Sequence, residues 1–248
     1  MKDKIIKKRY DQIDVLRGIF FIPMFIFHLF SFYDLNSNFT TRLSYNKILT
    51  YLGYVRNLYI ILAGYSLHLS WKSYQETQIN LNQKSTIFGF IKYRFIRSGN
   101  IAFNALIITI ISHILYPSYG IKFGILHFIA FGTLLLSPIA TFENINITIF
   151  FCLVWMYITS YNLIPIVNPI IDTITGKFIH YSAADYFPLN RNLILLILGL
   201  FLGQTIHPKL KPQNINNIYK FMGQNSLELY TTHFIIIMIL YWCLYKYN

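Results

Sequence analysis

The chain has 248 residues, of which 55% are hydrophobic and only 12% are Asp, Glu, Lys or Arg, about half the charged content of a typical soluble domain. Together with a mean hydropathy of +0.46, this composition excludes an ordinary soluble globular domain. The formal charge of +12 does not indicate nucleic-acid binding, because the basic residues lie between long apolar runs, where they fit the control of membrane topology.

Seven apolar segments, most of them near the roughly 20 residues that cross a bilayer, predict membrane helices. In chain order they are 15–33, 51–71, 97–115, 122–140, 145–161, 192–206 and 226–245. The first follows a basic stretch but ends without a small-residue cleavage site, so we expect a retained helix and not a signal peptide. The short apolar segment 163–171 contains Pro165 and Pro169, which predicts a re-entrant or interfacial piece, or an eighth span if it crosses.

The sequence therefore predicts an all-α polytopic transmembrane helix bundle of about seven spans, forming a single domain over residues 1–248. Its main partner is the lipid bilayer. With the N-terminus inside, thirteen of the 21 Lys and Arg residues fall on inner segments and six on outer ones, and Arg17 and Arg56 lie within or at the edge of spans. Because cytoplasmic loops retain positive charge, we expect a cytoplasmic N-terminus and a multi-pass protein of the cell membrane, plasma or inner.

The first predicted helix and its start carry three polar residues that are costly in a membrane: Asp14, Arg17 and His28. The eleven-residue step from Arg17 to His28 leaves their side chains about 20° apart on a helix and about 16 Å apart along its axis. Asp14 lies on the same face. One interpretation is an interfacial ion pair and a packed histidine. The other is a functional face, in which His28 transfers protons.

Other titratable residues are scattered along the chain. The remaining histidines are His68, His113, His127, His180, His207 and His233. No two have the H-x-x-x-H spacing of a helical metal site, so we expect no metal. Cys152 and Cys243 both fall in apolar segments and are interpreted as packing residues.

Five stretches, in order, resemble the heparan-alpha-glucosaminide N-acetyltransferase-like family, within the broader class of transmembrane acyltransferases. They are IDVLRG at 13–18 with His28, AGYSL at 63–67, FGILH at 123–127, ADYFPL at 184–189, and GQNSLELY at 223–230 followed by His233. The spacing of Arg17 and His28 is also similar to the Arg-x10-His signature of the wider class. The resemblance covers nearly the whole chain.

The resemblance implies an acetyl-CoA-dependent enzyme that moves an acyl group, usually acetyl, from the cytoplasmic side to a sugar hydroxyl or amine, often across the membrane. Its implied catalytic residues are His28, Arg17, Asp14 and His127. The polyanionic donor would bind Arg17, Lys92, Arg94 and Arg97, with Asn225 and Ser226 at the start of the last helix, whose other interpretation is an ordinary helix cap. The sugar or glycan acceptor would bind Asp185, Tyr186 and His233.

The catalytic histidine departs from the family pattern in one respect. Members that act on lysosomal heparan sulfate carry it in the loop after the first helix, but residues 34–50 contain no histidine here, so we expect His28 or His127 to take its place. The histidine could act as a general base or be acylated itself. Two other hypotheses are a small transporter or channel that uses the same polar face, and a non-catalytic membrane scaffold.

Overall fold

The computed structural model describes residues 10–36, 39–117, 120–161, 169–176, 185–206 and 217–246. Within these residues all regular secondary structure is helical, as the sequence predicts. His180, His207 and most of the segment 163–171 lie outside the described residues.

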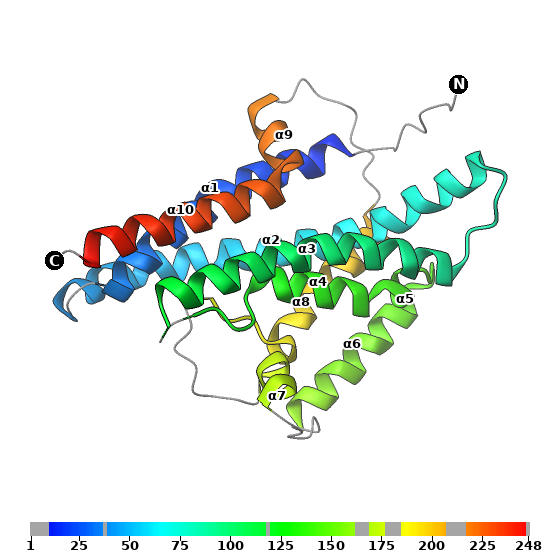
Figure 1. Cartoon of the computed structure of the whole chain (residues 1–248). Helices are drawn as coiled ribbons and strands as arrows, with labels where there is room; N and C mark the ends of the chain where they lie inside the picture. The colour runs from blue at the N-terminus through cyan, green and yellow to red at the C-terminus, as the bar shows by residue number, and fades with distance from the viewer. Residues whose placement is uncertain are drawn as a thin grey trace.

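Ten helices follow one another in the described ranges (Figure 1). They are α1 (Asp11–Asn36), α2 (Phe39–Asn80), α3 (Ile87–Leu115), α4 (Ile125–Leu135), α5 (Ser137–Ala140), α6 (Ile145–Ser160), α7 (Pro169–Thr175), α8 (Leu189–Thr205), α9 (Asn217–Gln224) and α10 (Ser226–Lys246).

Each of the seven predicted helices is present, with three informative differences. α2 and α3 are much longer than their apolar runs. Hydropathy detects only the apolar part of a helix, whereas the backbone hydrogen bonds continue through the polar residues at its ends. The predicted helix 122–140 is divided into α4 and α5 near Pro138, whose nitrogen has no hydrogen to donate. α9 has one polar and one apolar face, so its mean hydropathy did not reveal it.

Three of the described helices are both long and apolar enough to cross a membrane: α1 over Asp11–Phe32, α3, and α10 over Ser226–Leu244. α4, α6 and α8 are apolar but shorter. The structure thus supports a polytopic helical bundle.

α2 is the central helix of the bundle. It packs against α1 on one side and α8 on the other, while α10 packs against α1 and α3 (Figure 1). At the α2–α8 crossing, a Cβ atom on Gly64 would collide with the backbone of Leu196, and one on Gly199 with the backbone of Ile61. The two glycines therefore allow these helix backbones to approach more closely than larger residues would.

α1 places its polar residues through ordinary helical periodicity. Its buried positions recur every three or four residues, at Asp14, Gly18, Phe21, Met24, His28 and Phe32. The face predicted to carry Asp14 and His28 is therefore the face that packs into the bundle. α9 crosses this helix near its start, where a Cβ on Gly223 would collide with the backbone of Asp14.

Candidate active site

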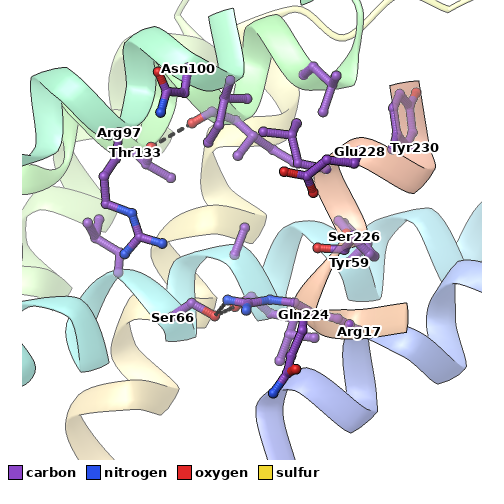
Figure 2. A pocket seen from close by; sticks show the side chains of 18 of the residues that line it. Arg17, Tyr59, Ser66, Arg97, Asn100, Thr133, Gln224, Ser226, Glu228 and Tyr230 are labelled. Carbon is purple, nitrogen blue, oxygen red and sulfur yellow. Dashed lines mark hydrogen bonds between the residues drawn. The ribbon is translucent and has the colours of Figure 1, made fainter. Parts of the chain in front are cut away.

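A cavity of about 320 Å³ lies between α1, α2, α3, α4 and the α9–α10 junction (Figure 2). A second cavity of about 380 Å³ adjoins it, and both are lined by Arg17, Ser66, Arg97 and Gln224. Their combined size falls in the range of small-molecule and cofactor sites.

Arg17 is held in place at the boundary of the two cavities. Its Nη1 donates to Asp14 Oδ1 at 2.9 Å and its Nη2 donates to Ser66 Oγ at 2.7 Å. The Ser66 hydroxyl donates in turn to the carbonyl of Leu62 at 2.6 Å. The Asp14 side chain is 2% exposed whereas that of Arg17 is 28% exposed, so the buried carboxylate orients a cation that still faces the cavity.

Two further arginines from α3 complete a cationic cluster, which we define as Arg17, Arg94 and Arg97. All three line the first cavity, and Arg17 and Arg97 extend into it from α1 and α3 (Figure 2). Arg94 is buried, and its Nε has no hydrogen-bond partner among the described residues. Like charges repel one another more strongly when partly removed from water, so the cluster favours a polyanionic ligand.

The other end of the cavity is aromatic and leads to His28. Tyr59 of α2 and Tyr230 of α10 line it there. The Tyr230 ring lies edge-on to the His28 ring, with centroids 5.5 Å apart. Phe234 packs edge-on against the same imidazole at 4.7 Å. His28 thus lies directly behind the cavity wall, among rings that limit its contact with water.

His28 is paired with His233 of α10, 205 residues away. His28 Nδ1 lies 2.9 Å from His233 Nε2, and His233 Nδ1 lies 2.8 Å from the carbonyl oxygen of Leu229. Because a carbonyl can only accept, His233 Nδ1 carries its hydrogen, and in the neutral ring its Nε2 is an acceptor. His28 Nδ1 must then donate to it. This arrangement leaves a lone pair on His28 Nε2, to which no described residue is hydrogen-bonded.

A second polar group lies beyond Tyr59. The guanidinium of Arg56 lies over the ring of Phe187 at 4.3 Å and near Phe27 at 5.8 Å. Asp185 interacts with it electrostatically, but its Oδ2 accepts a hydrogen bond of 2.9 Å from the amide of Ile125, at the start of α4. Burial raises the pKa of the Asp185 carboxyl to about 6, although this hydrogen bond and Arg56 act in the opposite direction.

The structure brings most, but not all, of the predicted site residues together. His127 is not in ring contact with His28: its Nδ1 accepts from the Gly124 amide at 3.3 Å, within the first turn of α4. Lys92 is exposed on α3 and does not line either cavity. The Tyr186 hydroxyl donates to the carbonyl of Thr173 at 2.7 Å.

The two residues predicted at the start of the last helix differ in position. Ser226 lines the cavity beside Tyr59 (Figure 2). The Asn225 side chain instead donates to the carbonyl of Phe221 at 2.8 Å, and Asn225 is not among the lining residues. The Asn225 side chain is thus hydrogen-bonded to the end of α9 and not to an amide of α10.

Sequence reasoning did not single out Arg56, Tyr59, Ser66 or Tyr230 as site residues. All four lie in the apolar run 51–71 or in the last helix, where Tyr59, Ser66 and Tyr230 resemble ordinary helix residues. Arg56 does carry a signal in the sequence, because a charged residue within or at the edge of an apolar run is costly in a membrane and is therefore a candidate functional residue.

Comparison with known proteins confirms the family resemblance. The sequence model of one family, described as heparan-alpha-glucosaminide N-acetyltransferase, catalytic, matches residues 9–235. The match includes the arginine cluster and both paired histidines. No curated protein and no solved structure shows significant similarity to the chain.

Proposed function

We propose that this chain, which belongs to the heparan-alpha-glucosaminide N-acetyltransferase catalytic family, transfers an acetyl group from cytoplasmic acetyl-CoA to a hydroxyl or amine of a sugar. One observation carries the proposal. A single cavity begins at the arginine cluster and ends at Tyr230, which is in ring contact with His28. The chain would act as one acyltransferase domain.

The arginine cluster would bind the phosphates of the donor. Guanidinium groups form paired, charge-assisted hydrogen bonds with phosphate oxygens, and Arg94 has a buried Nε that is without a partner among the described residues. Ser66 and Asp14 hold Arg17 in a fixed direction, which lowers the entropy lost on binding. The narrow acyl-bearing arm of the donor would then extend past Leu62 and Tyr59 towards His28.

His28 would act as the general base. Its free Nε2 lone pair accepts the proton of the acceptor O–H or N–H while the acceptor atom attacks the thioester carbonyl carbon. The C–S bond then breaks, the CoA thiolate leaves, and the proton passes from His28 to sulfur. The same lone pair could attack the thioester directly and form an acyl-histidine, in which case the kinetics would be ping-pong.

The acceptor would bind at Asp185 and Tyr186, which precede α8. Asp185 interacts electrostatically with Arg56 and with Tyr230, the residue in ring contact with His28. The carboxyl of Asp185 offers one oxygen beyond the one that accepts from Ile125. Tyr186 would contribute its ring, because its hydroxyl donates to Thr173. A sugar presents hydroxyl groups and apolar C–H faces, which suit this combination.

For topology we propose about seven spans, a cytoplasmic N-terminus and a location in the cell membrane. The distribution of Lys and Arg supports this orientation, since it puts the arginine cluster on the side that contains acetyl-CoA. Single cysteines introduced at Gln83 and at Asn144, in the connections after α2 and α5, should both label only from the cytoplasmic side. Labelling from the outer side would contradict the orientation.

The function is tested by incubating the purified protein in liposomes with acetyl-labelled CoA and a panel of sugars and amino sugars. We expect CoA release together with label on one acceptor, and neither with His28→Gln. If the wild-type protein neither binds CoA nor consumes the thioester with any acceptor, the proposal is wrong. Solute flux without thioester consumption would instead support a transporter.

A further inference from the structure

Arg56 is a cationic residue with no assigned role next to the proposed reaction centre. It is on α2, three residues from Tyr59, which lines the closed end of the cavity. Three residues correspond to almost one helical turn and about 4.5 Å, so both side chains lie on neighbouring parts of the same helix surface. Arg56 is thus located just past the point where the donor cavity ends.

Its neighbours are the residues that flank the reaction centre. The charge of Arg56 interacts with the ring of His28 and with Tyr230. Its guanidinium also lies near Phe27, the residue that precedes His28. A group that enters between Tyr230 and His28 would therefore experience the field of this cation.

The hydrogen-bonding capacity of Arg56 is unused in the described part of the chain. Its contact with Phe187 at 4.3 Å involves the face of the guanidinium, whereas its N–H donors point outwards in the plane. The Nε atom is buried and has no hydrogen-bond partner among the described residues. The nearby carboxylate of Asp185 is hydrogen-bonded to the amide of Ile125 instead.

We infer that Arg56 is a further catalytic residue, which stabilises the negative oxygen of the tetrahedral intermediate during acyl transfer. This inference rests on the proposed function. When the acceptor atom bonds to the thioester carbon, the carbonyl electron pair moves onto oxygen, and His28 takes the acceptor's proton. Collapse returns the electron pair, breaks the C–S bond and delivers that proton to sulfur. A fixed cation that is partly removed from water lowers the energy of the charged oxygen more than that of the neutral carbonyl.

The test uses two ligands, so that no acceptor has to be known. Trifluoroacetonyl-CoA has a ketone that hydrates to a tetrahedral centre and mimics the intermediate, whereas the ketone of acetonyl-CoA stays trigonal. Their dissociation constants would be measured on the full chain in nanodiscs, by competition with labelled acetyl-CoA. We expect wild type to prefer the trifluoro compound and Arg56→Gln to lose at least about tenfold of that preference, with unchanged affinity for CoA.

Matched variants separate this role from others. Arg97→Gln should weaken both ketones equally, because it belongs to the arginine cluster, and Phe187→Leu should keep the preference because it removes only the ring beneath Arg56. If Arg56→Gln fails to fold, Arg56→Lys is tested in its place. It keeps the charge but not the planar donors, so its preference for trifluoroacetonyl-CoA over acetonyl-CoA should be reduced.

Several results would overturn the inference. An unchanged preference in the folded Arg56 variant, no preference in wild type, or an equal loss of affinity for CoA itself would each do so while leaving the proposed function in place. Failure of wild type to bind any CoA compound would overturn the proposed function, and this inference with it.

Discussion

The arginine cluster and the histidine pair lie at the two ends of one cavity and differ in how their polar groups are satisfied. At the cluster, three cations share a partly open space, and among the described residues only Arg17 of the three forms an ion pair with a carboxylate, that of Asp14. At the histidine pair, two imidazole rings are hydrogen-bonded to each other and enclosed by Phe and Tyr side chains. The first arrangement is suited to attracting a ligand, and the second to holding one lone pair in a fixed direction.

We therefore expect the arginine cluster to determine the affinity for the donor and the histidine pair to determine the rate of the chemical step. Removing a cation from the cluster should weaken donor affinity and leave the chemical step nearly intact, since the contact is equally strong in the ground state and the transition state. Removing a group from the histidine pair should slow the chemical step and leave the donor affinity nearly unchanged. The following variants test whether the two ends behave so differently.

The largest effect is expected for His28→Gln, which removes the proposed base. Acyl transfer should fall by about 10³-fold, near the middle of the range for loss of general acid–base catalysis, while the dissociation constant for CoA stays the same. His113→Gln is the matched control, because that histidine is exposed on α3 and its Nδ1 is hydrogen-bonded to the Thr109 carbonyl of the same helix. A larger loss for His127→Gln than for His28→Gln would transfer the catalytic role to α4.

The second effect concerns His233, which we expect to orient His28. His233→Phe removes the acceptor of the His28 Nδ1–H and should lower kcat by about 100-fold with little change in either KM. His233→Gln retains a side-chain oxygen that can accept this hydrogen and should recover most of the rate. If His233 instead binds the acceptor, both variants would raise the KM for the acceptor and leave kcat unchanged.

The third effect is on the donor. Arg94→Gln should raise the KM and the dissociation constant for acetyl-CoA by about tenfold, as expected from losing one charge-assisted hydrogen bond of about 1.5 kcal/mol, with kcat nearly constant. Lys92→Gln is the control, because Lys92 lies outside both cavities. Equal effects of the two variants would indicate a general surface-charge contribution.

The smallest effect is a pH-dependent change in stability at Asp185. Its pKa is about 6 in the folded protein and 3.8 ordinarily, so folding favours the protonated form and the carboxyl destabilises the fold as the pH rises from about 4 to above 6. Asp185→Asn should therefore raise the melting temperature by a few degrees at pH 7.5 and leave it unchanged at pH 4. An increase of the same size at both pH values would contradict this explanation.

Much of the fold could be predicted because apolar runs reveal buried or lipid-facing helices directly. The long ends of α2 and the amphipathic α9 could not, since their polar residues resemble those of loops. The common face of Asp14 and His28 was predictable from helical periodicity alone, and both residues are buried on that face.

The partners of these residues were less accessible to sequence reasoning. His28 meets His233 only because α1 and α10 pack side by side, and periodicity within one helix says nothing about its neighbour. The contact of Arg56 with Phe187 was equally hidden, because these residues are 131 positions apart in the sequence and meet only through helix packing. His127 has a sequence context as suggestive as that of His28, yet its imidazole accepts from the Gly124 amide at the start of α4 and lies 3.5 Å from the Thr109 hydroxyl of α3.

The close α2–α8 crossing at Gly64 and Gly199 also bears on how an acetyl group could travel. Ser66 and Arg56 lie ten residues apart on the same uninterrupted helix, which fixes a span of about 15 Å between the donor-binding end and the reaction centre. Hinged rocking of one half against the other would have to break this helix or separate it from α8. For the proposed acetyl-CoA donor, whose pantetheine arm is long and flexible, we therefore expect the arm to reach the reaction centre without hinged rocking of the helices.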